Sequence, residues 1–216
     1  NFHKYERIYT FNETILKKCP NAIKYVYGTS TFQENEYSNI DISKKQYKIS
    51  NLAGSKLINN ALGHKHRQTI HKKQKLLSFY PIIFFRSSVQ LPHLLDYGNN
   101  PLLQDKKDLF ESFQFAIIIE NSKQQHYFTE KLIDCLLMKT IPIYWGCPNI
   151  SDYFDTTGWI LLDNTNNIIQ ELKMKLFIIM TSNYYNEHLH TINHNYSTAI
   201  YYSDLYKNIN MSSLTK

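Results

Sequence analysis

The sequence predicts an α/β fold, a Rossmann-like parallel sheet with flanking helices, and two observations carry this prediction. First, residues 113–149 contain two short apolar runs, Phe115–Ile119 and Ile141–Trp145, on either side of a helical pattern that opens near Thr129. This strand–helix–strand order is typical of a βαβ unit, which crosses over right-handed in a parallel sheet. Second, segments of strand and helix character alternate in the same way from about residue 46 to residue 200, as they do in α/β domains.

Residues 1–35 have the pattern of the end of a preceding α/β domain. Two strand-like runs enclose a short helix that has an asparagine as its N-cap: Arg7–Phe11, Asn12–Lys18 and Ala22–Tyr27. Residues 36–46 are polar, carry both charge signs and lack periodicity, so we expect a linker there. Because the chain opens at Asn1 without a methionine, we expect that the N-terminal part of a longer protein is missing.

The segments that follow predict one Rossmann-like domain over residues 47–200 and a tail over residues 201–216. Outside the central unit, the expected elements are a strand at Tyr47–Ala53, a basic helix at Gly63–Leu77, a strand at Pro81–Phe85, a segment that is mostly loop at Gln90–Lys107, a strand at Trp159–Leu162, a helix at Ile168–Met180, and one or two helices within Tyr184–Tyr206. The helix at 168–180 is predicted from apolar residues near helical spacing, and the loop from its prolines and glycine.

Composition and charge narrow the class of protein and of partner. Of the 216 residues, 43% are hydrophobic and 14% aromatic, enough for one large domain or one domain and part of another. The net charge of +6 and the pI near 9.0 favour an anionic partner: nucleic acid, an anionic membrane or a phosphorylated small molecule. Three widely spaced cysteines form neither a metal pattern nor a disulfide framework, which favours a reducing compartment. No apolar run approaches the ~20 residues of a membrane-spanning helix, and the start does not resemble a signal peptide.

A candidate anion-binding residue follows the first strand of the predicted domain. Ligands of such sheets bind beyond the carboxyl ends of the strands, and Arg67 is expected in the first turn of the next helix. Backbone N–H groups and the helix dipole attract phosphate there, and a planar guanidinium suits a diphosphate. Arg67 belongs either to such a site or to a solvated basic face, which is the interpretation expected for Lys72, Lys73 and Lys75.

A second cluster, formed by Tyr127, Glu130 and Lys131, lies where the helix of the central unit begins. A lysine at that place is unusual, because the helix dipole disfavours a cation unless an anion compensates it. We therefore expect a bound negative charge near Lys131. Glu130 suits the dipole and could accept hydrogen bonds from ribose hydroxyls. The alternative is a Glu–Lys pair at a frayed helix end.

Glu120, Asn121 and Ser122 end the apolar strand, and a carboxylate there must be hydrogen-bonded or paired if it is buried. We expect Glu120 to hold the loop in shape, with contact to a ligand as the alternative. Cys147 has no nearby base in the sequence and is not expected to be a nucleophile. The nine histidines form no metal-binding set and are expected to be solvated or in the core. The absence of a GxGxxG or P-loop pattern excludes an ordinary NAD or ATP site.

Taken together, these motifs resemble the donor-domain signature of the α-1,3-fucosyltransferase family, glycosyltransferase family 10. The matching segments are IENS at 119–122, YFTEKLIDCL at 127–136 and TIPIYWGCPN at 140–149. The family pattern is approximately F-E-N-S, Y-[VI]-T-E-K and [VI]-P-[VI]-x-x-G-x-P, from which Ile119 and Phe128 depart. Upstream, GHKHRQTI at 63–70 is similar to the family segment with a single key arginine, and Gly54-Ser55-Lys56 to its strand end. The resemblance covers roughly residues 47–163.

The resemblance implies a two-domain GT-B fold, of which this chain would supply the C-terminal, donor-binding half and residues 1–35 the remnant of the acceptor-side domain. It implies an inverting glycosyltransferase of protein glycosylation that transfers fucose from GDP-fucose to a glycan hydroxyl. The GDP-sugar would be a co-substrate, with no metal and no cofactor in the site. Carried over by motif, Arg67 and Lys131 would contact the diphosphate, Tyr127 would help to hold it, and Glu130 would take the ribose hydroxyls.

The family's general base is a carboxylate of the N-terminal domain, and we match it to none of the early glutamates of this chain: Glu6, Glu13, Glu34 and Glu36. The chain could therefore be a non-catalytic GDP-sugar- or glycan-binding module without its acceptor domain. The basic helix could also bind nucleic acid or an anionic surface, although its basic residues lack interleaved aromatic residues. We expect no nucleic-acid partner, no transmembrane segment in this chain, and a cytoplasmic or membrane-peripheral location, or the Golgi if an N-terminal anchor is missing.

Overall fold

The centre of the molecule is a five-stranded sheet with the strand order β4-β3-β5-β6-β7, in which all neighbouring strands are parallel. The structure, a computed structural model, describes residues 2–54, 61–87, 100–163, 166–180 and 183–214. The strands of this sheet are β3 (Gln46–Ala53), β4 (Ile82–Arg86), β5 (Phe113–Ile119), β6 (Ile141–Trp145) and β7 (Ile160–Leu161). The expected fold class, a Rossmann-like parallel sheet with flanking helices, is confirmed.

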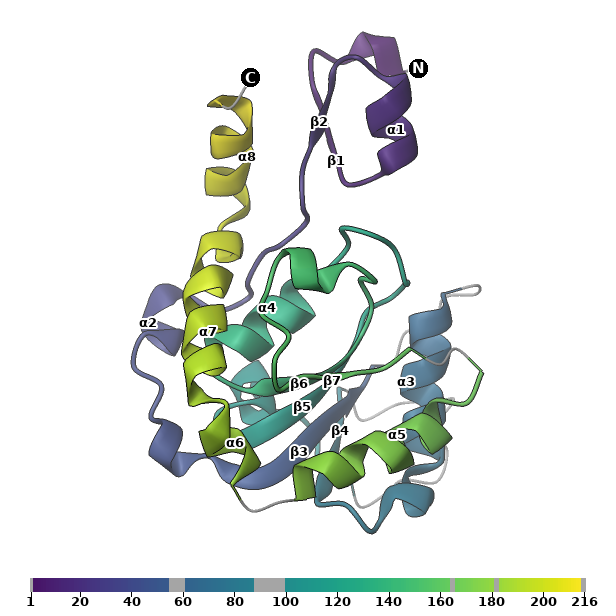
Figure 1. Cartoon of the computed structure of the whole chain (residues 1–216), viewed down its shortest axis with the longest axis vertical. Coiled ribbons are helices and arrows are strands. Elements are labelled where there is room, and N and C mark those ends of the chain that lie inside the picture. The colour runs from purple at the N-terminus through teal and green to yellow at the C-terminus, as the bar shows by residue number, and fades with distance from the viewer. Residues whose placement is uncertain (1, 55–60, 88–99, 164–165, 181–182, 215–216) are drawn as a thin grey trace.

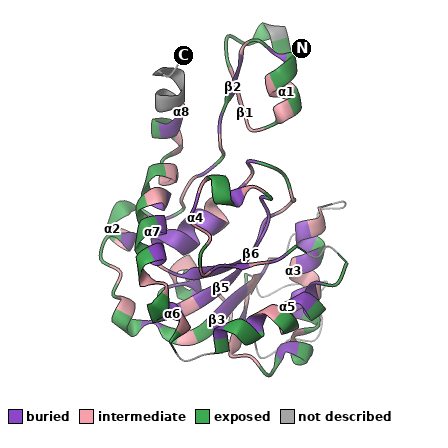
Figure 2. Ribbon diagram, viewed as in Figure 1, coloured by how far each residue is buried: buried purple, intermediate pink, exposed green. Residues whose placement is uncertain are grey.

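Helices cover both faces of the sheet (Figure 1). One face packs against α3 (Leu62–Lys72) and α5 (Ile168–Leu176), and the other against α4 (Glu130–Leu137) and α7 (Leu189–Ser203). The central strand β5 is apolar throughout because alternate side chains enter different cores. Ala116 and Ile118 pack on the α4 side, and Phe115, Ile117 and Ile119 pack on the α3 side. Figure 2 shows this burial concentrated in the sheet and the helix faces against it.

The order of the strands places a topological switch point between β3 and β5. From β3 the chain passes through α3 to β4 on one side, then returns to form β5 on the other side of β3 and continues outward through β6 and β7. The helices that follow β3 and β5 therefore lie on opposite faces of the sheet. A crevice at the carboxyl ends of two such strands is the usual ligand position in open α/β sheets.

The N-terminal segment forms a separate parallel pair of strands, β1 (Ile8–Thr10) and β2 (Ala22–Lys24), joined by α1 (Glu13–Lys18). The expected N-cap is present, because the side chain of Asn12 accepts hydrogen bonds from the backbone N–H groups of Thr14 (3.0 Å) and Ile15 (3.2 Å). The segment lies at one end of the molecule beside α8 (Leu205–Leu214), which packs against β2 (Figure 1).

The polar segment at 36–46, expected as a linker, is partly helical. It includes the end of α2 (Glu34–Tyr37) and the 3-10 helix Ile42–Lys44. A reciprocal capping box between Gln33 and Glu36 begins α2, and the Tyr37 side chain is buried in the core beside α4. The linker is predicted because the segment is polar. The local sequence does not show that Tyr37 packs into the core, and this tertiary contact orders the segment. The proposed domain boundaries stay a prediction.

Several helix ends differ from the expected ones. The helix expected at 63–77 stops at Lys72 and continues as a 3-10 turn, and the helix expected at 168–180 does the same after Leu176. The residues expected as a tail at 201–216 are helical up to Leu214, within α7 and α8. Much of the loop expected at 90–107, and Ser55 and Lys56, lie outside the described residues. The remaining helices are α6 (Tyr184–Glu187) and the 3-10 helices Phe2–Lys4, Gln74–Leu77, Lys106–Leu109, Ile150–Asp152 and Phe177–Met180.

A buried carboxylate ties the N-terminal segment to α4. Asp134 is fully buried and accepts hydrogen bonds from the hydroxyls of Ser30 and Thr31, both at 2.7 Å, and from the backbone N–H of Thr31 at 3.0 Å. Its second oxygen lies 2.5 Å from Nζ of Lys106. Lys106 keeps 30% of its side chain exposed, so the donors of Ser30 and Thr31 are the groups that would lose a buried acceptor if Asp134 were removed, which is unfavourable.

A second buried charge lies at the amino edge of the sheet. Nζ of Lys45 donates hydrogen bonds to the backbone oxygens of Phe110 (2.8 Å) and Phe113 (3.1 Å) and to the hydroxyl of Thr140 (3.0 Å). Burial lowers the pKa of Lys45 from its usual 10.5 to about 7. The unfolded chain therefore keeps this proton over a pH range in which the folded chain has lost it.

We expect Asp134→Ala to lower the free energy of unfolding by about 3–5 kcal/mol, because it removes the buried partner of Lys106 and three hydrogen-bond acceptances. The matched control is Asp163→Ala, whose carboxylate is 79% exposed and pairs with Lys123 at 3.1 Å. An exposed pair contributes about 0–1 kcal/mol. Urea unfolding of both variants measures the difference. Equal losses would contradict the structural role of Asp134.

We expect the stability contribution of Lys45 to rise with pH between about 7 and 10.5, because across that window the unfolded state binds the additional proton. Lys45→Met should therefore gain stability relative to the wild type at pH 6, and this relative gain should shrink towards pH 9. Chemical unfolding at several pH values measures the change. The exposed Lys48 on β3 supplies the control, and Lys48→Met should show no such trend. A constant difference between Lys45→Met and wild type would rule out the shifted pKa.

Candidate functional site

The predicted site residues meet at the carboxyl edge of the sheet, at the switch point between β3 and β5. They come from three places: α3 after β3, the loop after β5, and the first turn of α4. Residues that lie far apart in the sequence therefore meet at one edge of the sheet, the edge at which open α/β sheets usually bind their ligands.

Arg67 contacts the end of the central strand directly. It is the sixth residue of α3 and lies in the second turn, not in the first turn as the sequence indicated. Its Nη1 donates to the backbone oxygens of Ile119 (2.5 Å) and Glu120 (3.3 Å), and its Nη2 donates to Oδ1 of Asn121 (2.9 Å). Burial lowers the pKa of the guanidinium, while nearby carboxylates oppose this change. These contacts hold a cation at the strand end.

Glu120 holds the first turn of α4 in place. The Glu120 side chain is fully buried and accepts hydrogen bonds from the backbone N–H and the hydroxyl of Thr129, both at 2.8 Å. Thr129 is in turn the N-cap of α4. Burial raises the pKa of Glu120, and the ammonium of Lys131 with the two Thr129 hydrogen bonds only partly opposes this. The geometry is that of a scaffold contact, the role expected for this carboxylate.

Lys131 at the start of α4 has anionic partners within the protein. Its Nζ lies 3.0 Å from Oε1 of Glu130, 3.7 Å from Oε2 of Glu120 and 3.1 Å from the hydroxyl of Thr129. Burial acts to raise the pKa of Glu130, but the attraction and hydrogen bond of Lys131 outweigh it, so this pKa is lowered. The compensating charge that the sequence led us to expect near Lys131 is thus supplied, without a ligand, by two carboxylates.

Tyr127 completes the cluster from the loop that precedes α4. Its hydroxyl is hydrogen-bonded to the side chain of Asn121, which also accepts from Arg67. Burial, and then the charges of Glu120 and Glu130, raise the pKa of Tyr127 to about 12, so the phenol is protonated at neutral pH and can donate. Asn121 therefore links Arg67 and Tyr127, two of the predicted ligand-binding residues. Ser122 is half-buried in the same loop.

Two glycines that the sequence analysis did not assign make this packing possible. A Cβ at Gly63 would lie 1.7 Å from the backbone oxygen of Glu120, so only glycine lets α3 approach the end of β5. A Cβ at Gly146 would lie 2.7 Å from Cγ of Glu120. A glycine early in a helix and a glycine directly after a buried strand were the available signals.

His126 was also missed, and it joins the loop of the site to the N-terminal segment. It is buried and has a φ of 61°, a left-handed conformation that is costly for a residue with a side chain. Its Nε2 lies 3.0 Å from Oε1 of Glu13 in α1, and its Nδ1 lies 2.5 Å from the hydroxyl of Tyr153. Its backbone N–H donates to Oδ1 of Asn149 (2.9 Å). A lone histidine in a loop carries no sequence signal for such a cluster.

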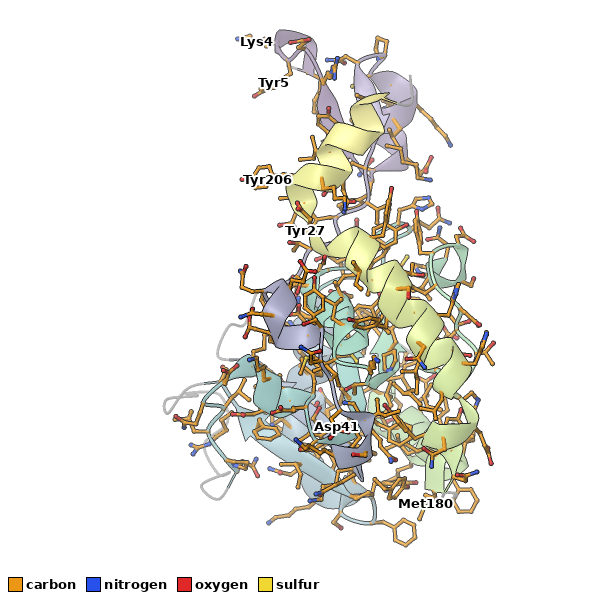
Figure 3. All side chains as sticks on the ribbon, turned by 90° about the vertical axis from the view of Figure 1, so that its left-hand side faces the viewer. Lys4, Tyr5, Tyr27, Asp41, Met180 and Tyr206 are labelled. Carbon is orange, nitrogen blue, oxygen red and sulfur yellow. The ribbon has the colours of Figure 1, made fainter. Side chains whose placement is uncertain are left out.

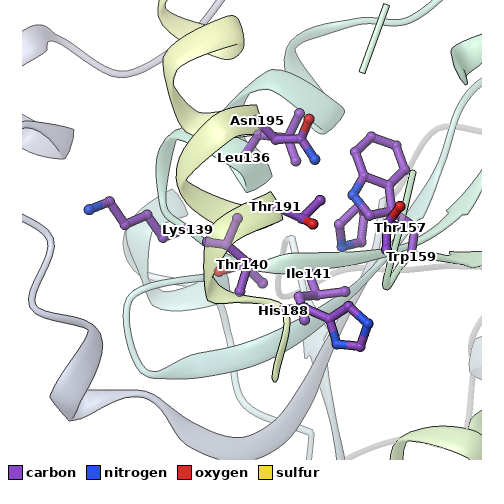
Figure 4. A pocket seen from close by; sticks show the side chains of 11 residues that line it. Leu136, Lys139, Thr140, Ile141, Thr157, Trp159, His188, Thr191 and Asn195 are labelled. Carbon is purple, nitrogen blue, oxygen red and sulfur yellow. The ribbon is translucent and has the colours of Figure 1, made fainter. Parts of the chain in front are cut away.

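The cavities near the sheet differ in position and size. One lies between α4, α7 and the start of β6, at the amino edge, and is lined by residues such as Thr140, Trp159 and His188 (Figure 4). Its free volume of about 10 Å³ suits one water molecule and no sugar nucleotide. A second, of about 40 Å³, lies at the carboxyl ends of β6 and β7, between Lys123 and Gly146, on the edge that carries the predicted site.

The described residues provide neither a metal-binding cluster nor an exposed cysteine. Among the described residues, no group of three or more His, Cys, Asp and Glu side chains could hold a metal ion. The three cysteines are free and buried. Burial raises the pKa of the Cys147 thiol, which disfavours the reactive thiolate.

Solved structures share this fold. The structure of an α1,3-fucosyltransferase with GDP matches 96% of this chain and 73% of its own chain, with a TM-score of 0.58 and 16% sequence identity. The structure of an α1,3-fucosyltransferase with GDP-fucose matches 94% of this chain and 73% of its own, with a TM-score of 0.56 and 16% identity. The expected fold, the C-terminal half of a GT-B fold, is thereby confirmed.

The sequence relatives of this chain carry the same kind of name as the matching structures. Alpha-(1,3)-fucosyltransferase FucT of Helicobacter pylori is 26% identical over 103 residues, which are 48% of this chain and 19% of the relative. Alpha-(1,3)-fucosyltransferase B of Drosophila melanogaster is 35% identical over 85 residues, 37% of this chain and 19% of the relative. The matches thus span about a fifth of the length of these relatives. Residues 57–210 match the family profile "Glycosyltransferase family 10 (fucosyltransferase) C-term", and the chain belongs to this family.

Proposed function

We propose that this chain binds GDP-fucose and provides the donor side of an inverting fucosyl transfer to a glycan hydroxyl. The observation that carries the proposal is the convergence of Arg67, Glu130 and Lys131 at the switch point, in a chain of glycosyltransferase family 10. The two sequence relatives are named α-(1,3)-fucosyltransferases, and the matching structures are described with GDP or GDP-fucose. These names support a GDP-sugar as the co-substrate.

The diphosphate would lie between the two cations. Arg67 presents its guanidinium from α3, and Lys131 presents its ammonium from the opposite side of the crevice. On binding, phosphate oxygens would replace part of the contact that Lys131 makes with Glu130, which lies 3.0 Å from Nζ. Glu130 would then accept hydrogen bonds from the ribose hydroxyls. The protonated phenol of Tyr127 would donate to a phosphate oxygen.

The reaction would displace GDP from the anomeric carbon of fucose. The acceptor oxygen attacks that carbon from the face opposite the diphosphate, so that the new bond has inverted configuration. The bond between the anomeric carbon and the β-phosphate oxygen breaks, and the electron pair stays on GDP. Arg67 and Lys131 stabilise the charge that builds on this leaving group, which is a large term in such transfers. The proton of the acceptor hydroxyl goes to a carboxylate base of the acceptor-side domain.

Two of the four early glutamates, Glu13 and Glu36, have other partners in this structure. Glu13 pairs with His126, and Glu36 caps α2 and pairs with Lys107 at 3.0 Å. These contacts favour a base from outside this chain and keep a second function open: a GDP-sugar-binding module that does not turn over its ligand. The two functions share the donor site and differ only in catalysis.

We expect GDP to bind this chain and to raise its melting temperature, because a ligand that binds only the folded state stabilises it by about 2.7 kcal/mol at 100 times its Kd. Arg67→Ala and Lys131→Ala should abolish the shift. Arg67→Lys should retain only part of it, because an ammonium lacks the planar fork of donors. Thermal shift with and without GDP, each variant compared with its own ligand-free form, separates lost binding from lost stability.

The control for that measurement is Lys123→Ala, which removes a cation from the same sheet edge, where Lys123 pairs with the exposed Asp163. Its GDP shift should equal that of the wild type. No shift of the wild type at millimolar GDP would remove the donor-site assignment.

We expect the full-length protein to release GDP from GDP-fucose in the presence of a glycan acceptor, and to leave UDP-sugars unchanged. Lys131→Ala should lower kcat by about 10²–10³-fold, the usual effect of removing one stabilising donor. A panel of GDP-fucose, GDP-mannose and UDP-sugars measures this by GDP release and product mass. GDP binding without any turnover of GDP-fucose would support the non-catalytic function.

A further inference from the structure

The amino edge of the sheet carries a surface that the donor site does not use. Helices of a parallel sheet begin at the carboxyl edge and end at the amino edge, so the 3-10 helix after α3 and the end of α5 both reach this edge. The donor site lies at the other edge. Figure 3 shows Met180 at the end of the molecule opposite to Lys4 and Tyr5.

Six large apolar side chains are exposed on these two segments, and we call them the amino-edge patch: Leu76 (52% exposed), Phe79 (71%), Met174 (59%), Phe177 (68%), Ile178 (54%) and Met180 (36%). One hydrogen bond and one packing contact join the segments. The hydroxyl of Tyr80 donates to the backbone oxygen of Lys173 at 2.5 Å, and Leu77 shares a core with Leu172. Exposed apolar side chains gathered on two segments that pack together point to an interaction site.

The helical end of the patch is apolar on two faces. Leu172, Leu176 and Ile179 are fully buried against the sheet. Met174, Phe177 and Ile178 have the spacing i, i+3 and i+4, and they form a second apolar stripe that faces away from the core. An ordinary surface helix of a soluble domain carries polar residues on that side. The core of this domain does not account for the second stripe.

Lysines surround the patch, and no acidic residue lies within either of its segments. Residues 72–80 and 172–180 contain five lysines and neither aspartate nor glutamate: Lys72, Lys73, Lys75, Lys173 and Lys175. Lys73 and Lys75 are exposed. Glu171, the acidic residue directly before the second segment in the sequence, is buried and lies 2.9 Å from Nζ of Lys175. The surface therefore combines protruding apolar side chains with a positive rim.

We propose that the amino-edge patch docks the protein on an anionic lipid membrane. Apolar side chains that enter the boundary between headgroups and acyl chains, beside lysines that attract anionic headgroups, are the usual chemistry of interfacial binding. In this orientation the donor site faces away from the bilayer. Among the described residues, no helix is long and apolar enough to cross a membrane, and surface docking needs none.

A membrane fits this surface better than nucleic acid does. The lysines of the basic helix lack interleaved aromatic residues, but Phe79 follows them in the sequence, and Phe177 lies on the segment that Tyr80 contacts. Nucleic-acid surfaces use aromatic rings as stacking platforms next to cations. Here four of the six exposed apolar side chains are aliphatic or thioether chains, namely Leu76, Met174, Ile178 and Met180. Such chains enter lipid and cannot stack on bases.

The test is co-sedimentation of the protein with vesicles. We expect binding to vesicles of phosphatidylcholine mixed with phosphatidylserine, and much weaker binding to phosphatidylcholine alone. Lys73→Gln and Lys75→Gln should each lower the partition coefficient roughly fivefold. The double variant Phe79→Ser/Phe177→Ser should bind vesicles more weakly than either lysine variant. At high salt, where the attraction of the lysines is screened, it should also bind more weakly than the wild type. All four substituted side chains are exposed, so the variants should keep the wild-type melting temperature.

Matched controls lie elsewhere on the surface. Lys17→Gln/Lys18→Gln removes two exposed cations from α1, and Tyr206→Ser removes a side chain that is 77% exposed on α8. These variants should bind vesicles like the wild type. Failure of the wild type to bind phosphatidylserine vesicles, or equal loss in patch and control variants, would overturn the proposal. A dimer in light scattering that Phe79→Ser/Phe177→Ser converts to a monomer, or salt-sensitive DNA binding without vesicle binding, would overturn it in favour of those partners.

Discussion

A carboxylate buried at the end of the central strand organises the candidate site. Glu120 ends β5, and both of its oxygens accept hydrogen bonds from Thr129, the N-cap of α4. A buried carboxylate without partners would be strongly unfavourable, so the loop between β5 and α4 has to close around it. Gly63 lets α3 approach the backbone of the same residue, where Arg67 donates to the strand end. Three elements are thus fixed relative to one charge.

This arrangement leaves the site electrostatically balanced before a ligand enters. The cations of Arg67 and Lys131 face the carboxylates of Glu120 and Glu130, so the positive charges are held in place rather than free in solvent. In the proposed function, a diphosphate would have to compete with Glu130 for Lys131. Preorganisation of this kind lowers the cost of orienting the cations at the moment when charge builds on the leaving group. Glu120, whose pKa is raised by burial, thus belongs to the framework of the proposed donor site.

The two edges of the sheet have different surroundings. The carboxyl edge is polar, and the loop that carries Tyr127 is held against the N-terminal segment by the pair of His126 and Glu13 and by the ring contact of Phe11 with Tyr127 at 5.3 Å. The amino edge is apolar and basic around Phe177. Because the two edges lie at opposite ends of the strands, the proposed docking surface would leave the carboxyl edge free for the proposed donor site.

The sequence by itself determined the strands of the sheet, the helix cap at Asn12 and the family. A run of apolar residues as short as Ile141–Trp145 is stable only when buried on both faces, and local caps such as Asn12 depend on neighbours in the chain. The tertiary structure decided which groups meet. Several features depend on residues far apart in the sequence. They include the hydrogen bonds of Arg67 to the end of β5, the pairing of Lys131 with Glu120, the contact of His126 with Glu13, the ordered segment around Tyr37 and the amino-edge patch. Local patterns record propensity and periodicity, whereas these contacts arise only when the sheet order and the crossovers bring distant segments together.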